Sequence, residues 1–233
     1  FIQHVGLGIY DVLCEQGYIV FAVSPGSIQI FSVKQMIKNV QSAIKFVIIN
    51  AEQFKISNKS LGLLGISAGG HLATCAISLT FDWSSNVTIE KQEIFESIKA
   101  MSLFAVPFNL LELYTRSVIP ELTEILKRLI RKKSFYEEET SIPNSEIEKR
   151  LAEVSPYYFD LSKIEKPPYT LSFHGTKDEI VPYYQSEKFF EKIRYHNWKS
   201  ELITKNNAPH IWIDMRDDFE YTGKKFEEIL SNN

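Results

Sequence analysis

The chain has little cysteine and no large excess of charge of either sign. It holds two cysteines, Cys14 and Cys75, in 233 residues. This count argues against a disulfide framework or a zinc site built from cysteines. Both cysteines fall in apolar helical patterns, so we expect buried free thiols. The formal net charge of −3 gives no attraction to nucleic acid or to an anionic membrane surface, so neither partner is predicted.

Long hydrophobic runs are also lacking, since none approaches the roughly 20 apolar residues of a membrane span. What is present is the balance of a globular domain, with 44% hydrophobic and 24% charged residues. A chain of this length can bury a full core, so we expect one domain over residues 1–233. The composition leaves the compartment and the oligomeric state open.

The most informative segment is Gly65-Ile66-Ser67-Ala68-Gly69. An apolar run over residues 60–64 reads as a buried strand before it, and residues 70–77 read as a helix after it. Strand, G-x-S-x-G, helix is the context of a nucleophile elbow, a tight turn that presents a serine hydroxyl. Glycine at positions 65 and 69 is expected because bulk two residues from the serine would block the turn. The unpaired N–H groups of the helix start suit a developing oxyanion.

Strand and helix patterns alternate along the chain, which is typical of a mostly parallel sheet with helices on both faces. We expect strands over residues 18–23, 61–65, 98–106, 168–173 and 201–204. We expect helices over residues 1–15, 33–54, 69–79, 182–195 and 217–230.

Residues 108–161 interrupt this alternation. They contain a helical piece at 119–131 and are predicted to form a cap-like insertion over the carboxyl ends of the strands, where ligand sites form in α/β folds. A lid over the site and a passive surface excursion are both consistent with the pattern.

A serine nucleophile needs a base, and the base needs an acid that orients it. Asp178 is our candidate acid, because it lies on the loop after the strand that ends at Phe173. Glu179 is the neighbouring alternative. A turn or helix-capping role for Asp178 is the non-catalytic alternative, since Pro182 begins a helix four residues later.

His210 is the candidate base, on a loop after the last predicted strand. One helix and one strand separate it from Asp178, which is the crossover that brings the two loops together. The other histidines fit less well. His71 is expected to pack beneath the serine, His174 to make a structural hydrogen bond, and His196 to lie at a helix end, while His4 falls in the first helical pattern.

Taken with these residues, the chain resembles the α/β-hydrolase superfamily, and within it the carboxylesterases and acetyl-xylan or feruloyl esterase-like enzymes. These are related to the catalytic domains of prolyl oligopeptidases. The resemblance covers nearly the whole chain and is most specific at the elbow and at the His-Gly-x-x-Asp-x-x-Val-Pro segment. The matching segments are residues 17–23, 65–72, 155–156, 167–168 and 174–182, together with His210.

The resemblance implies Ser67 as nucleophile, Asp178 as acid, His210 as base and the Ala68 N–H as one oxyanion donor. It implies hydrolysis of a small ester or an acylated carbohydrate through an acyl-enzyme, with no cofactor or metal. A prolyl-oligopeptidase-like peptidase and a non-catalytic binding protein of the same fold are the alternative functions.

Two features depart from the family pattern. Ala208 and Pro209 precede the histidine where the family usually has glycine beside it, which leaves the path of this loop open. The His-Gly-Gly segment that supplies the second oxyanion donor is also lacking. We therefore expect that the first strands are missing from the chain and that it hydrolyses esters poorly by itself. Residues 24–27 are the next place to look for the second donor.

Overall fold

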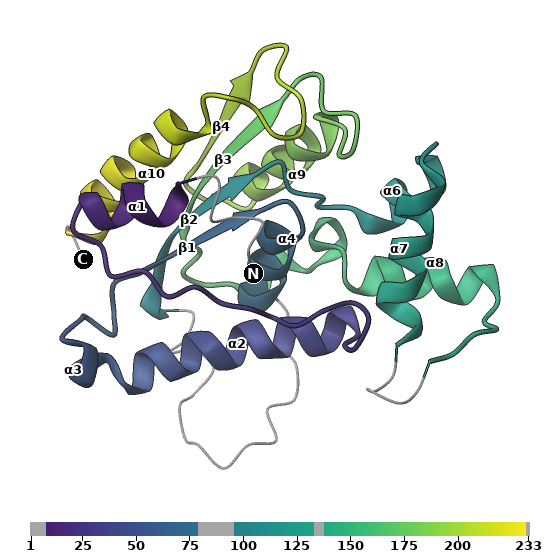
Figure 1. Cartoon of the computed structure of the whole chain (residues 1–233), viewed down its shortest axis with the longest axis horizontal. Coiled ribbons are helices and arrows are strands. Elements are labelled where there is room, and N and C mark those ends of the chain that lie inside the picture. The colour runs from purple at the N-terminus through teal and green to yellow at the C-terminus, as the bar shows by residue number, and fades with distance from the viewer. Residues whose placement is uncertain (1–7, 79–95, 133–137, 232–233) are drawn as a thin grey trace.

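The computed structural model describes residues 8–78, 96–132 and 138–231. Its sheet has four parallel strands in the order β1-β2-β3-β4 (Figure 1). The strands are β1 (Leu61–Ile66), β2 (Ile98–Phe104), β3 (Tyr169–Gly175) and β4 (Ser200–Lys205). These strands confirm four of the predicted ones. β2 ends earlier than expected because Ala105 turns into a left-handed conformation, with φ of 50°.

Helices separate the strands as predicted. They are α1 (Ile9–Glu15), α2 (Val33–Ile49), α3 (Ala51–Phe54), α4 (Ala68–Ser78), α9 (Tyr184–Tyr195) and α10 (Met215–Leu230). A capping box begins α2, in which the Ser32 hydroxyl accepts from Gln35 N and the Gln35 side chain accepts from Ser32 N. The single helix predicted over residues 33–54 is broken at Asn50, whose side chain donates to the Phe46 carbonyl 2.7 Å away.

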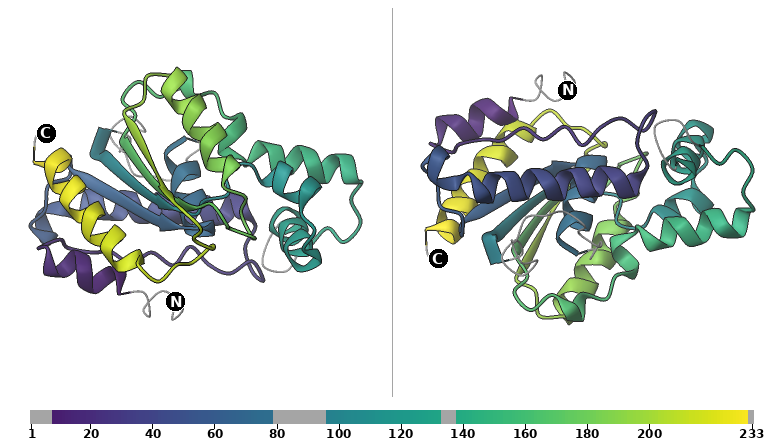
Figure 2. Two further views of the ribbon diagram at one scale, coloured as in Figure 1. Left: turned by 90° about the horizontal axis from the view of Figure 1, so that it is seen from above. Right: turned by 90° about the horizontal axis from the view of Figure 1, so that it is seen from below.

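Alternating side chains of the strands feed two hydrophobic cores on opposite faces of the sheet. Met101 and Leu103 of β2 pack in the core shared with α2, α4 and α9. Phe104 of β2 and Phe173 of β3 pack with α1 and α10 in the other core, where their rings stack 4.7 Å apart. Figure 2 shows α1 and α10 side by side across the sheet from α2. Both faces of the sheet are therefore covered, as expected for a parallel sheet.

The chain between β2 and β3 forms a helical cluster to one side of the sheet (Figures 1 and 2). It contains α6 (Leu110–Arg116), α7 (Pro120–Arg131) and α8 (Asn144–Glu153), followed by the short helices η2 (Pro156–Tyr158) and η3 (Leu161–Lys163). Each of the three longer helices places two side chains in the first core, among them Leu113, Leu126 and Leu151. The helical part of the predicted insertion is thus present, and a cap role for it stays a prediction.

Two predictions in the first part of the chain are wrong. Residues 18–23 form no strand, because no described segment pairs with them through a ladder of backbone hydrogen bonds. Ile19 in this segment is 57% exposed. Cys14 is exposed, because α1 turns its neighbours Val12 and Leu13 toward the core. Cys75 is free and buried, as predicted.

Two further predicted helices lie partly outside the described residues. Residues 1–7 of the predicted first helix and the last residue of the helix predicted over 69–79 lie outside them. Within the described ranges, every helix is too short or too polar to traverse a bilayer.

Candidate active site

Ser67 lies in a sharp turn between β1 and α4. It is the first residue after the strand, and its φ of 50° is in the left-handed region that residues with a side chain rarely adopt. Its N–H donates to the Phe104 carbonyl at 2.7 Å, and its carbonyl accepts from His71 N at 3.0 Å. These bonds fix the strained turn from both sides, and strain of this kind gathers at functional sites.

Two glycines make the turn possible, but they are not the pair that the motif suggests. A Cβ at Gly65 would lie 2.5 Å from Gly70 Cα, and a Cβ at Gly70 would lie 2.2 Å from a Val106 methyl carbon. A Cβ at Gly69 would meet no atom within 4 Å. The expectation that position 69 must lack bulk is therefore wrong: the close approach is between residues 65 and 70.

The loop that carries His210 is held against the end of β3. Gly175 allows this approach, since a Cβ there would lie 2.2 Å from the Ala208 carbonyl oxygen. The same oxygen accepts from Lys177 N at 3.0 Å. Beyond the histidine, the Trp212 indole N–H donates to the buried carboxylate of Asp218 at 2.7 Å. Ala208 and Pro209 thus give a fixed path to this loop without the glycine usual in the family.

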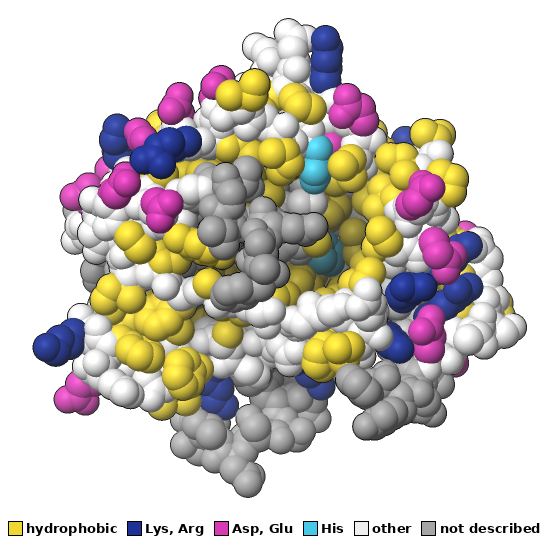
Figure 3. All heavy atoms as spheres, viewed as in Figure 1, with side chains coloured by type: hydrophobic (Ala, Val, Ile, Leu, Met, Phe, Trp, Pro, Cys, Tyr) yellow, Lys and Arg dark blue, Asp and Glu magenta, His cyan; other side chains and the backbone are white. Residues whose placement is uncertain are grey.

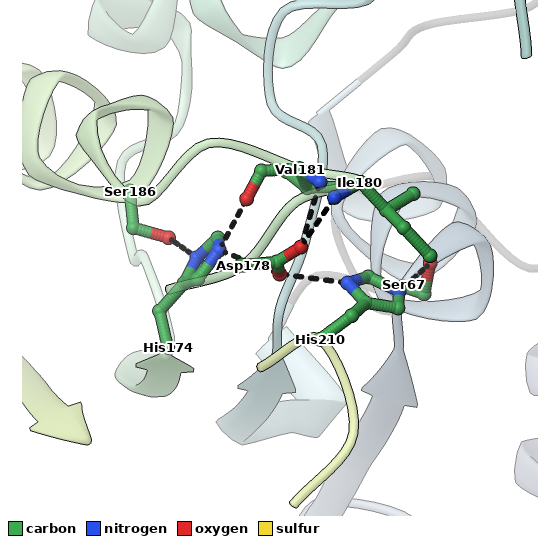
Figure 4. A network of polar contacts seen from close by, with 7 residues as sticks. All are labelled: Ser67, His174, Asp178, Ile180, Val181, Ser186 and His210. Carbon is green, nitrogen blue, oxygen red and sulfur yellow. Dashed lines mark hydrogen bonds and ion pairs between the residues drawn. The ribbon is translucent and has the colours of Figure 1, made fainter. Parts of the chain in front are cut away.

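The structure brings Ser67, His210 and Asp178 into one hydrogen-bonded line (Figure 4). His210 Nδ1 lies 2.7 Å from Asp178 Oδ2, and His210 Nε2 lies 3.0 Å from Ser67 Oγ. Because a carboxylate can only accept, Nδ1 carries the ring proton, which leaves Nε2 free to accept from the serine hydroxyl. This is the geometry that a general base needs next to a nucleophile.

Asp178 uses both carboxylate oxygens. Oδ1 accepts from the backbone N–H groups of Ile180 and Val181 at 2.9 and 2.8 Å, while Oδ2 faces the histidines. The predicted turn role and the contact with His210 therefore coexist in one side chain. Burial raises the pKa of Asp178, but the hydrogen bonds from His174, His210 and Val181 N outweigh it and hold the pKa well below its usual range. Glu179, the alternative acid, is exposed.

His174 also belongs to this site, and its place in the His-Gly-x-x-Asp-x-x-Val-Pro segment, four residues before Asp178, was the signal for it. Its side chain is fully buried, and its Nε2 lies 3.1 Å from the Oδ2 atom that also faces His210. The structural hydrogen bond that we expected of His174 is thus made to the candidate acid itself.

The other histidines lie away from this line. His71 is buried behind the elbow, with Nδ1 2.9 Å from the Pro107 carbonyl oxygen and Nε2 3.5 Å from Cys75 Sγ. Burial lowers its pKa to about 4, so it stays neutral at neutral pH. His196 is half-buried at the end of α9, and His4 lies outside the described residues.

The candidate oxyanion donor is the exposed Ala68, the first residue of α4. N–H groups in a first helical turn have no acceptor within the helix, and the helix dipole favours negative charge there.

In the loop suggested for a second donor, residues 24–27, the Ser27 carbonyl accepts from Ile30 N and Phe31 N, and the Ser27 hydroxyl accepts from Gln29 N. These hydrogen bonds of Ser27 are all local and stabilise the turn, so a second oxyanion donor in residues 24–27 stays a prediction.

The surface around the histidines is hollowed and apolar. Figure 3 shows a hollow with hydrophobic side chains gathered about it and histidine side chains in its wall. Ile180 and Ile211, two and one residues past the acid and the base, are 42% and 43% exposed. Among residues 8–78, 96–132 and 138–231, no three His, Cys, Asp or Glu side chains gather as they would around a metal ion.

Comparison with known proteins identifies the family of this chain. Residues 3–193 match the BD-FAE family, whose members are α/β-hydrolase esterases. The match covers most of the chain, so the chain belongs to this family.

One curated relative is a probable isoprenylcysteine alpha-carbonyl methylesterase of Oryza sativa subsp. japonica. It is 23% identical over 225 residues, which cover 94% of this chain and 50% of the relative. The chain therefore spans half the length of this relative.

Solved structures show the same fold at low sequence identity. A truncated carbohydrate esterase from gut microbiota superposes with a TM-score of 0.73 at 21% identity, covering 96% of this chain and 78% of that one. The bifunctional GH43-CE protein of Bacteroides eggerthii gives 0.74 at 20% identity, covering 96% and 29%. An acetyl ester-xyloside bifunctional hydrolase from Caldicellulosiruptor lactoaceticus gives 0.62 at 21% identity, covering 85% and 67%. The fold is thus the predicted α/β-hydrolase fold.

Proposed function

We propose that the chain is a serine hydrolase that cleaves a carboxylic ester through an acyl-enzyme intermediate. The observation that carries this proposal is the line from Ser67 Oγ through His210 to Asp178, with contacts of 3.0 and 2.7 Å. Membership of an esterase family favours an ester over the peptide bond of the related oligopeptidases.

In the first half of the reaction, Ser67 Oγ attacks the ester carbonyl while His210 Nε2 takes the hydroxyl proton. The negative charge on the former carbonyl oxygen faces the start of α4, where the Ala68 N–H is one donor. Asp178 stays ionised at neutral pH because its pKa is lowered, so it stabilises the positive charge on His210. His210 then gives the proton to the departing alkoxide, and the acyl group remains on Ser67.

In the second half, water replaces the alcohol. His210 takes a proton from the water as it attacks the acyl carbonyl, and the proton returns to Ser67 as the acid product leaves. Every proton is carried by His210, so this chemistry asks for no cofactor.

For the substrate, we propose a small ester or an acylated carbohydrate. Structural neighbours are described as carbohydrate esterase and acetyl ester-xyloside hydrolase, and the hollow with histidine side chains in its wall is surrounded by hydrophobic side chains that suit a short acyl group (Figure 3). The helical cluster α6–α8 is the candidate for a cap that contacts the alcohol part.

The proposal is tested with four substrates: p-nitrophenyl acetate, p-nitrophenyl butyrate, acetylated xylan and a chromogenic prolyl peptide. Ser67→Ala, purified in parallel, is the control for contaminating hydrolases. We expect hydrolysis of the esters, with kcat/KM far above that for the peptide, and no hydrolysis by the control. Preference for the peptide would indicate the peptidase alternative. A folded wild-type protein that is no more active than Ser67→Ala, and whose Ser67 is not labelled by a serine-reactive phosphonate, would indicate a binding protein.

A further inference from the structure

Two histidines contact one oxygen of Asp178. Oδ2 lies 2.7 Å from His210 Nδ1 and 3.1 Å from His174 Nε2 (Figure 4). The simplest serine–histidine–acid line needs only the first of these contacts. The second comes from a fully buried ring at the end of β3, and it asks for an explanation.

The contacts of His174 decide which of its nitrogens carries the proton. Nε2 lies 3.1 Å from Asp178 Oδ2 and 2.8 Å from the Val181 carbonyl oxygen, and both atoms are acceptors. Nε2 must therefore be an N–H donor shared between them. On the other side of the ring, Nδ1 lies 2.6 Å from Ser186 Oγ. A serine hydroxyl can turn to donate to Nδ1, which completes the ring's hydrogen bonds without a second proton.

The His174 ring is also held in place by packing. β3 turns residue 174 toward α9, away from the face of Leu171 and Phe173, and α9 supplies Ser186. The Tyr183 ring stands at 89° to the imidazole, with centroids 5.7 Å apart. A donor on such a ring points in one fixed direction, which a side chain on a mobile loop would not do.

We propose that His174 is a positioning residue that fixes the carboxylate of Asp178 in the orientation that His210 needs, and that Ser186 sets the tautomer of His174. This inference rests on the proposed function. Val181 and Ile180 hold Oδ1 through backbone N–H groups, and His174 holds Oδ2, so the carboxylate cannot rotate away from His210. The acid is thus oriented before substrate arrives, when His210 has yet to become charged.

The test compares two substitutions at the same position. In His174→Gln, the side-chain amide places an N–H donor near the position of the lost Nε2, whereas His174→Leu keeps the bulk and removes the donor. His196→Leu is the matched control, since His196 lies at the far end of α9. The measurements are kcat and KM for p-nitrophenyl acetate, with a thermal melt of each variant.

We expect His174→Leu to lower kcat about 10- to 100-fold with KM unchanged, the size expected for a hydrogen bond to a charged group. His174→Gln should recover most of this loss, and His196→Leu should match the wild type. Ser186→Ala should lower kcat about 2- to 10-fold, the size of a neutral hydrogen bond. A purely structural role would instead lower the melting temperatures of both His174 variants and give no selective recovery of kcat by glutamine.

Wild-type kcat in folded His174→Leu would overturn the inference and leave the proposed function intact. If His174→Leu does not fold, wild-type kcat in Ser186→Ala would overturn it instead. A wild-type protein without hydrolase activity would overturn the proposed function and this inference with it.

Discussion

The carboxyl ends of β1 and β3 both place a polar side chain against His210, but the two side chains differ in their exposure to solvent. At the end of β1, Ser67 is half-exposed and its hydroxyl meets His210. At the end of β3, the Asp178 side chain is fully buried, and both its oxygens are bonded to neighbouring groups. Under the proposed function this contrast has a physical reason: the exposed hydroxyl can meet a substrate, whereas the buried carboxylate keeps its charge in one fixed position.

The largest expected effect is at the exposed end of β1. Ser67→Ala removes the atom that attacks, and loss of the nucleophile in a serine hydrolase lowers kcat by about 10⁶-fold. We expect p-nitrophenyl acetate hydrolysis to fall to background, with the melting temperature little changed because the elbow backbone stays the same. Retained hydrolysis would place the nucleophile elsewhere, and the exposed end of β1 would then not be the site of attack.

Substitution of the buried Asp178 at the end of β3 should give the next largest loss of kcat. Asp178→Asn keeps the shape of the side chain but removes the charge that sets the tautomer of His210, a change worth about 10⁴-fold in kcat in serine hydrolases. Glu179→Gln is the matched control next door, and it should retain full kcat because Glu179 is exposed. Equal losses in the two variants would show that the acid is misassigned.

The same Asp178→Asn variant should show the buried charge in its stability. Folding lowers the pKa of Asp178, so its ionised form stabilises the folded state above about pH 4, and this contribution is lost as the pH falls further. The difference in melting temperature between wild type and variant should therefore be large at pH 7 and smaller at pH 3. A difference independent of pH would count against a fixed charge.

A third effect comes from the buried histidine behind the elbow. The pKa of His71 is lowered to about 4, so between pH 4 and 6.5 the unfolded chain binds the extra proton. The free energy of unfolding should therefore fall as the pH falls through this window, by about 3 kcal/mol from this group. His71→Asn, which keeps a donor for the Pro107 carbonyl, should flatten the dependence relative to wild type in urea unfolding. His196→Gln is the control and should leave the dependence in place.

The smallest effect separates two adjacent glycines in the turn. Gly70→Ala forces a methyl group against Val106, and overpacking of this kind costs about 1–3 kcal/mol. Gly69→Ala enters open space and should change the free energy of unfolding by less than about 0.5 kcal/mol. Urea unfolding of both variants checks this. A Gly69→Ala variant as unstable as Gly70→Ala would contradict the packing described for the elbow.

The strands could be predicted because four apolar runs were bounded by clear breaks, and alternation with helices fixed their parallel pairing. The strand predicted over residues 18–23 was wrong for a physical reason. An apolar run becomes a strand only if another segment pairs with it, and the composition of the run does not show whether a partner exists. The break at Asn50 and the exposure of Cys14 depend on a local hydrogen bond and on which face of a short helix packs, and neither leaves a strong mark in the sequence.

The meeting of Ser67, Asp178 and His210 could be predicted from chain order and from the loops that carry them. Their catalytic roles stay predictions. What the sequence could not supply was the surroundings of the acid. His174 contacts Asp178 because both lie at the end of β3, and Ser186 reaches His174 from α9, a contact across elements that spacing does not encode. Likewise, the need for glycine at 70 rather than 69 depends on Val106 of a different segment.

Labelling with a serine-reactive phosphonate tests whether Ser67 is an activated nucleophile. The reagent is applied to folded wild type, Ser67→Ala and Asp178→Asn, and the modified peptide is found by mass spectrometry. We expect one adduct on Ser67 in the wild type, none in Ser67→Ala and much slower labelling in Asp178→Asn. An unlabelled wild-type protein, or an adduct on another serine that persists in Ser67→Ala, would contradict this expectation.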